Sequence, residues 1–181
     1  MQQLLIDPKV SRKKFKKEVK DLLKYKSELR KRGWIIESAK FPIVRVTFLA
    51  IRLTPPIAIL TVDIDFTNYN LCAPSIRFLN PVTLTPNCLQ ALRKLPSGEV
   101  SNLMINAHLD TREPFLCLPG TNEYHTHPQH DGDSWDIHRY TREGSLFFLL
   151  DNICKYLVQN ISAFHLSFQF TQIGFIQEAV E

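Results

Sequence analysis

The chain has 181 residues, of which 44% are hydrophobic and 22% charged, which suits one globular domain over residues 1–181 better than two. No apolar run reaches the roughly 18 residues that a membrane span requires, and no secretory signal pattern is present, so we expect a cytoplasmic protein. The net charge of +4 is uneven, because residues 9–32 carry a net +9 and the remainder −5.

The first predicted element is a basic amphipathic helix over residues 9–33. Ser11 is a suitable N-cap and Gly33 a natural stop. Between them apolar residues recur at helical spacing: Phe15, Val19, Leu22, Leu23 and Leu29. The opposite, lysine-bearing face is either solvated or a docking surface for an acidic protein, an acidic membrane or nucleic acid. Nucleic acid is disfavoured because no aromatic side chains interleave with the basic ones.

A meander of strands is predicted over residues 34–81. The extended segments are 34–37, 43–53, 57–66 and 75–79, and Pro55 and Pro56 separate the second from the third. The third segment alternates, with Val62 and Ile64 on one face and Asp63 on the other. Residues 82–110 show a less regular pattern.

After an irregular polar section, a second helix is predicted over residues 143–159. Its apolar stripe consists of Leu146, Leu149, Leu150, Ile153, Cys154 and Leu157. The end of the chain, from residue 163 to 175, alternates well enough for a last strand. Helix, consecutive strands, polar section, helix and strand predict an α+β fold with an antiparallel meander.

The polar section, residues 114–140, carries the chemistry. It contains Cys117 and four of the six histidines: His125, His127, His130 and His138. The four cysteines form no CxxC pair, and we expect free thiols. Cys154 is expected to be core filler within its helix, whereas Cys117 has histidines and a carboxylate nearby in sequence.

The element order resembles that of the ubiquitin-conjugating (UBC) enzymes. The stretch DFTNYNLCAPSIRFLNP, residues 65–81, is similar to the family motif that ends its third strand, and keeps Tyr69, Pro74 and Phe78. Cys117 in FLCL, Trp135 and the helix GSLFFLLDNICKYL then follow in the family's order. The resemblance covers roughly residues 15–157. A His-Pro-Asn signature is absent before the cysteine, so the oxyanion-stabilising side chain is not identified, and the spacing from Cys117 to Trp135 is longer than usual.

A second, local resemblance concerns the pattern C-x5-E-x-H-x-H, formed by Cys117, Glu123, His125 and His127. It is similar to a prokaryotic family of predicted metal-binding domains, named for its Cys-Glu-His-His (CEHH) quartet and associated with bacterial ubiquitin-like conjugation operons. If residues 123–127 are extended, Glu123, His125 and His127 point to one face. Such a quartet suits tetrahedral zinc, and it also suits a thiol nucleophile with an imidazole base oriented by a carboxylate.

Two hypotheses follow. In the first, a bacterial UBC-like carrier accepts a ubiquitin-like protein on Cys117 as a thioester and transfers it to a protein target. His125 or His127 is the base, Glu123 orients it, and no cofactor is needed. In the second, the quartet binds zinc in a non-catalytic adaptor. The UBC resemblance implies that an activating enzyme meets the basic helix, through Lys13, Lys16, Lys17 and Lys20. We expect neither nucleic acid nor a membrane as partner. Trp135 is predicted to anchor the loop in the core, while His130, Asp131 and His138 either line the same pocket or are exposed.

Overall fold

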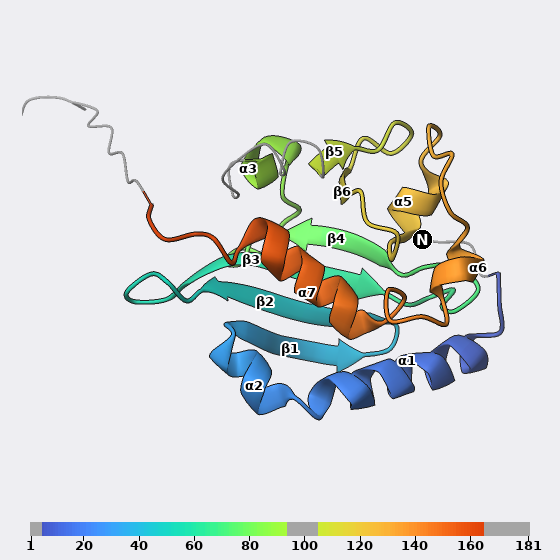
Figure 1. The fold of residues 1–181 in the computed structure, drawn as a ribbon, viewed down its shortest axis with the longest axis horizontal. Coiled ribbons are helices and arrows are strands. Elements are labelled where there is room, and N and C mark those ends of the chain that lie inside the picture. Colours follow the sequence, from blue (N-terminus) through green and yellow to red (C-terminus); the bar gives the residue numbers. More distant parts are fainter. Residues whose placement is uncertain (1–4, 94–104, 165–181) are drawn as a thin grey trace, which may run out of the picture.

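The computed structural model describes residues 5–93 and 105–164, and it has an α+β architecture (Figure 1). Four antiparallel strands form one sheet in the order β1-β2-β3-β4: β1 (Trp34–Lys40), β2 (Ile43–Ala50), β3 (Ile57–Asp65) and β4 (Ser75–Leu79). The predicted class and the meander are confirmed. The bounds of β4 are those expected from the sequence, and β2 ends at Ala50 instead of residue 53.

The two faces of the sheet differ in chemistry because side chains alternate along each strand. On the inner face the register pairs Val46 with Val62 and Phe48 with Leu60, and all four side chains are fully buried. On the outer face of the same two strands, Arg45 makes two hydrogen bonds to the Asp63 carboxylate, at 2.6 and 2.7 Å. The prediction that Val62 and Ile64 lie on one face of the strand and Asp63 on the other is therefore confirmed.

The inner face is covered by α7 (Leu146–Leu157), which crosses the sheet in Figure 1. Ser145 caps α7 by accepting a hydrogen bond from the backbone of Phe148, so the helix begins three residues later than the predicted start at 143. Phe147 packs on Trp34 of β1, with ring centroids 5.7 Å apart. Cys154 is buried, which confirms its role as core filler.

The predicted N-terminal helix is two helices, α1 (Pro8–Leu23) and α2 (Lys26–Lys31), which lie along the β1 edge of the sheet in Figure 1. Its predicted N-cap is wrong: the Asp7 side chain accepts from the backbone of Lys9, and Ser11 lies buried inside the helix. The predicted stop at Gly33 is confirmed. Gly33 has φ +80°, and a Cβ there would stand 2.6 Å from the Leu49 carbonyl oxygen, so both backbone conformation and space favour glycine.

Short elements follow the sheet: α3 (Leu89–Arg93), β5 (Ile105–Ala107), β6 (Pro114–Leu116), α5 (Asn122–Thr126) and α6 (Trp135–His138). β5 and β6 pair as an antiparallel hairpin. The predicted last strand falls at residues 163–175, nearly all of which lie outside the described residues. Among the helices of residues 5–93 and 105–164, none combines the length and apolar character needed to cross a membrane.

Candidate functional site

Cys117 directly follows β6 and lines a cavity of about 520 Å³. Imidazole, phenol and carboxylate side chains share its wall: Tyr124, His127, His130 and Asp131. The thiol is half-buried, and this burial raises the pKa of Cys117 above its ordinary value, because a thiolate loses solvation there. At neutral pH Cys117 is therefore a protonated thiol, and it needs a base before it can act as a nucleophile.

The segment after Cys117 is not extended, so the geometry expected for the Cys-Glu-His-His quartet is wrong. Thr121 caps the short helix α5 by accepting from the backbone of Tyr124 at 3.2 Å, and its hydroxyl donates to the Leu118 carbonyl at 3.0 Å. A helix turns successive side chains by about 100°, so Glu123 and His125 diverge where a strand would align them.

Glu123 points away from the cysteine cavity, toward the start of β4. Its two carboxylate oxygens accept from the backbone N–H of Ile76 at 3.2 and 3.3 Å, and they line a separate cavity with Asp65 and Ser75. Burial raises the pKa of Glu123, while hydrogen bonds from its own backbone, Ile76 and Ser75 oppose that rise. Glu123 thus joins α5 to the sheet, and in this arrangement it does not orient a histidine.

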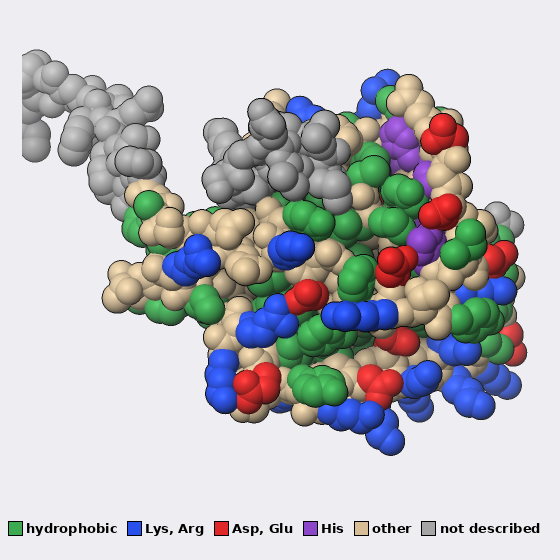
Figure 2. All heavy atoms as spheres, in the orientation of Figure 1, with side chains coloured by type: hydrophobic (Ala, Val, Ile, Leu, Met, Phe, Trp, Pro, Cys, Tyr) green, Lys and Arg blue, Asp and Glu red, His purple; other side chains and the backbone are tan. Residues whose placement is uncertain are grey.

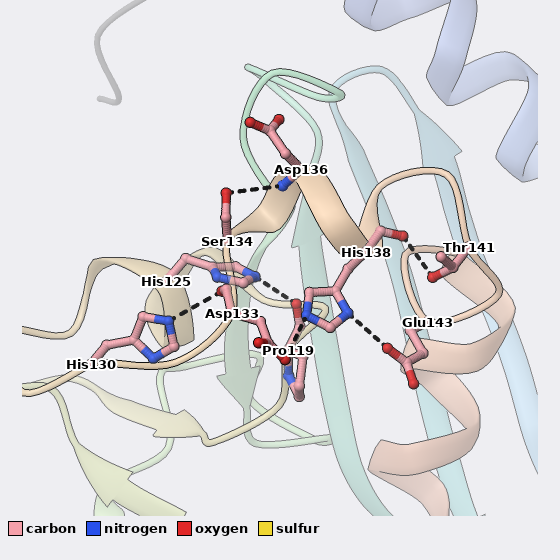
Figure 3. Close-up of polar contacts among 9 residues, drawn as sticks. All are labelled: Pro119, His125, His130, Asp133, Ser134, Asp136, His138, Thr141 and Glu143. Carbon is pink, nitrogen blue, oxygen red and sulfur yellow. Dashed lines mark hydrogen bonds and ion pairs between the residues drawn. The ribbon is translucent and has the colours of Figure 1, made fainter.

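His125 lies between α5 and α6, where it braces the loop (Figure 3). Its Nε2–H donates to the Pro119 carbonyl at 2.6 Å, and its ring centroid is 5.9 Å from that of buried His138. Burial lowers the pKa of His125, an effect that the neighbouring histidines reinforce and that hydrogen bonds to the Pro119 and Asp133 carbonyls oppose. His138 Nδ1–H in turn donates to the Glu143 carboxylate at 2.7 Å.

His127 and His130 do reach the cysteine cavity. The His127 ring stacks on Phe115, with centroids 5.2 Å apart, and meets buried His108 edge-on at 5.3 Å. The His130 ring lies 4.3 Å from that of Tyr124, and its Nε2–H donates to the Asp133 carbonyl at 3.3 Å. Of the histidines predicted to act as the base, His127 lines the cavity of Cys117 and His125 does not. His130 lines this cavity too.

The arrangement does not fit the predicted zinc site. Glu123 and His125 are committed to the contacts described above, and neither lines the cavity that holds Cys117 and His127. Across residues 5–93 and 105–164, no three His, Cys, Asp or Glu side chains converge closely enough to hold a metal ion. A structural tetrahedral site needs four converging ligands, so these residues would have to rearrange before they could bind zinc.

Comparison with known proteins matches most of the chain. Residues 6–96 and 84–161 match the Y4jH family. The chain belongs to this family. A relative from Sinorhizobium fredii (strain NBRC 101917 / NGR234), named "Uncharacterized protein y4jH", is 36% identical over 171 residues, which cover 83% of each chain. The matched residues include those of the meander, the cysteine cavity and α7.

The basic face of this Y4jH-family chain is exposed and lies apart from the histidines. Figure 2 shows Lys and Arg along the lower edge, over α1 and α2, and His at the upper right, over α5 and α6. The side chains expected to meet a partner, Lys13, Lys16, Lys17 and Lys20, are all exposed. Beside them a groove of about 470 Å³ runs between α1 and β1, with Phe15, Val19 and Phe41 among its lining.

Several residues of the site were not singled out from the sequence. Asn106 of β5 lines the cysteine cavity because the hairpin pairs it with Phe115, two residues before Cys117. His108 has no partner nearby in sequence, but in the fold its ring contacts that of His127. Tyr124 lies within the Cys-Glu-His-His pattern and could have been singled out from the sequence. It lines the cysteine cavity in the fold, where α5 is a helix. Trp135 is 6% exposed and donates to the Asn70 carbonyl at 3.1 Å, so its predicted anchoring role is confirmed.

Proposed function

We propose that this protein is a carrier of the ubiquitin-conjugating type. Cys117 accepts the C-terminus of a ubiquitin-like protein as a thioester and passes it to an amine or hydroxyl of a protein target. One observation carries the proposal: Cys117 lines a cavity together with two imidazoles, whereas Cys154 is a buried residue of α7 and Cys88 is exposed elsewhere. A thiol with acid/base groups in reach is what acyl transfer between thioesters requires.

The order of elements supports the same proposal. An N-terminal helix, a four-strand meander, a cysteine after a short hairpin and a helix across the sheet follow one another as in the resemblance drawn from the sequence. Tyr69 ties the segment between β3 and β4 to the entry of α7, since its hydroxyl donates to the Gly144 carbonyl at 3.2 Å. Trp135 holds the site loop to the same corner. Both contacts fix the loop that follows Cys117 relative to the sheet.

Asn106 supplies a group for the oxyanion. When a thiolate attacks a thioester, the carbonyl oxygen gains negative charge, and a side-chain amide in the cavity wall can donate to it. The Asn106 Oδ1 accepts from Arg93 at 3.4 Å, which orients the amide group. In this proposal Asn106 fulfils the role for which the sequence offered no His-Pro-Asn signature.

The basic face supplies the docking surface for the activating enzyme. The groove between α1 and β1 combines apolar side chains with Arg12, Lys16 and Lys20, so it suits a partner segment that is both apolar and acidic. Because this groove and the cysteine cavity lie on different parts of the molecule, docking and chemistry use separate residues.

A thioester assay tests the proposal. The protein is incubated with ATP, an activating enzyme and the ubiquitin-like protein that this enzyme activates, and adducts are separated with and without reducing agent. Wild type should form an adduct that thiols cleave, Cys117→Ala should form none, and Cys117→Ser should form one that resists thiols. Cys88→Ala is the matched control and should charge normally. A wild type that is folded yet never charges, with its Cys117 peptide free to alkylate, would defeat the carrier.

A further inference from the structure

We infer that His130 is the base that takes the proton of Cys117, and that His127 and His125 are not. This assignment rests on the proposed function for its biological reaction, but its chemistry concerns a thiol and an imidazole that share one cavity. Three features carry it: the protonated state of the thiol, the hydrogen bonds that fix each imidazole tautomer, and the space left by Gly132.

The thiol needs a base from within its own cavity. Burial raises the pKa of Cys117 because the thiolate loses solvation in the cavity. Such a thiol gains reactivity from a nearby group that removes its proton, because the thiolate is the nucleophile. The imidazoles that line the cavity are those of His127 and His130.

Hydrogen bonds to the backbone distinguish these two imidazoles. A neutral imidazole carries its proton on one nitrogen and a lone pair on the other. His127 Nδ1 accepts from the backbone N–H of Gln129 at 3.3 Å, so its lone pair is engaged and its free nitrogen, Nε2, holds the proton. His130 is the same tautomer, but its other nitrogen is engaged: the Nε2–H donates to the Asp133 carbonyl, which leaves the lone pair on Nδ1 to accept a proton. His130 is therefore the acceptor and His127 a donor.

His125 donates to the Pro119 carbonyl through its Nε2–H, and its ring does not line the cysteine cavity. It sits behind Tyr124, between His130 and His138, with ring centroids 5.5 and 5.9 Å away. Its position suits bracing of the loop more than proton transfer from Cys117.

Gly132 keeps the proton-accepting edge of His130 open. A Cβ at this position would stand 2.7 Å from His130 Cε1, 3.3 Å from its Nδ1 and 2.8 Å from the Tyr124 hydroxyl. The absence of a side chain thus leaves one edge of the imidazole uncovered beside the cavity. Tyr124 lies near both His130 and Cys117. Its ring lies against that of His130. Burial raises the pKa of Tyr124, and the nearby Cys117 raises it further. Asp131 and Asp133 add to that rise.

The resulting step transfers one proton and one acyl group. The Cys117 proton passes to His130 Nδ1, directly or through one water molecule, and the sulfur attacks the thioester carbonyl carbon of the charged activating enzyme. A new C–S bond forms on Cys117, and the old C–S bond breaks to leave a thiolate on the activating enzyme. The imidazolium of His130 returns its proton to that thiolate or to water. His130 is unchanged at the end.

Alkylation of Cys117 by iodoacetamide tests the base without any partner protein. The rate is followed by mass spectrometry of the peptide that contains Cys117, at pH 7 and at pH 9.5. The variants are His130→Gln and His125→Gln, a matched pair in which the glutamine amide replaces the Nε2–H donor but removes the basic nitrogen. At pH 7, His130→Gln should slow alkylation by about tenfold or more, and His125→Gln by less than about twofold. At pH 9.5, where hydroxide also removes the thiol proton, the alkylation rates of the three proteins should differ less than at pH 7.

Equal rates for the two variants at pH 7 would overturn the assignment. Gly132→Ala provides the same test if His130→Gln does not fold, because the added methyl group displaces the edge of His130 while keeping every titratable group. A tenfold slowing with an unchanged melting temperature supports the inference, and an unchanged rate overturns it. A His130-dependent thiol in a protein that forms no adduct would instead defeat the carrier alone. Normal charging of Cys117 with no effect of His130→Gln on alkylation would defeat the base alone.

Discussion

The four-stranded sheet and the segment from 105 to 145 are held by different forces. In the sheet, strands of five to nine residues pair in register, and their inner side chains are buried against α7. In the segment from 105 to 145 the elements have three to five residues. Side chains bind backbone carbonyls there, as His125 binds Pro119 and Thr121 binds Leu118.

This difference separates stability from chemistry. Burial of apolar area provides most of the free energy of folding, and the sheet together with α7 contains far more of the buried apolar side chains than segment 105–145 does. Short helices contribute little by themselves, so segment 105–145 depends on the sheet for support and can hold polar groups at set positions. Loops on a rigid scaffold are where binding and catalytic residues are commonly found. Each of the following changes should affect one side of this division.

The largest effect is expected in the sheet. Phe48→Ala removes a fully buried ring that packs on Trp34, with centroids 5.5 Å apart, and should lower the free energy of unfolding by about 3–5 kcal/mol. Urea denaturation measures the loss. Ile137→Ala in α6, where the side chain is 60% exposed, is the control and should change stability by less than about 0.5 kcal/mol. A comparable loss for both would mean that the site segment is as central to stability as the sheet.

Charge reversal on α1 should weaken binding of the activating enzyme and leave both stability and Cys117 reactivity unchanged. Lys13, Lys16, Lys17 and Lys20 to Glu should slow charging by the activating enzyme by about tenfold at low salt, mainly through the association rate. The matched control reverses four exposed charges in and just before α2, Lys24, Lys26, Arg30 and Lys31. Stopped-flow charging at two salt concentrations compares them. Equal slowing in both variants would point to net charge, and normal charging in both would leave α1 as a solvated face.

The sequence predicts the sheet better than the site, for a physical reason. Alternation of apolar and polar residues in β3 and β4 reports burial on one face, and burial persists in the fold. Glu-x-His-x-His also alternates, yet Thr121 caps a helix there, and a cap of this kind overrides a five-residue pattern. The position of Glu123 depends on Ile76, 47 residues earlier, which no local pattern encodes. The cysteine and its histidine-rich loop were found from the sequence because the residue types themselves are unusual.

Tyr69 connects the two regions and should show an intermediate effect. Tyr69→Phe keeps the buried ring against Phe66 and Trp135 but removes the hydroxyl that donates to the Gly144 carbonyl. We expect a loss of about 1 kcal/mol in the free energy of unfolding, the usual net value of one hydrogen bond. Tyr25→Phe, whose ring is exposed on the turn before α2, is the control. A loss well above that value would indicate that the hydroxyl also holds the loop before α7 in place.

The smallest effect, and the one that depends on pH, is expected where α5 meets β4. Burial raises the folded-state pKa of Glu123. For a carboxyl group shifted in this direction, the stabilising contribution is fully present below the unfolded pKa, about 4.3, and is lost as pH rises through the folded pKa. Glutamine resembles the protonated side chain at every pH and can still accept from the Ile76 N–H. Glu123→Gln should therefore match wild type near pH 4 and become the more stable protein toward pH 8.

Urea denaturation at pH 4, 6 and 8 measures this difference, with Glu113→Gln, which changes an exposed carboxyl on the same cavity, as the control. If Glu123→Gln were the less stable protein at pH 8, the charged carboxylate would be needed by Ile76 and Ser75, and their hydrogen bonds would outweigh burial. Iodoacetamide alkylation of Cys117 should be the same in Glu123→Gln and in wild type at pH 7. A slower rate would mean that Glu123 takes part in the chemistry of the thiol, as the Cys-Glu-His-His pattern predicted. The contacts that hold α5 to the sheet and the groups that act on Cys117 would then not be separate sets of residues.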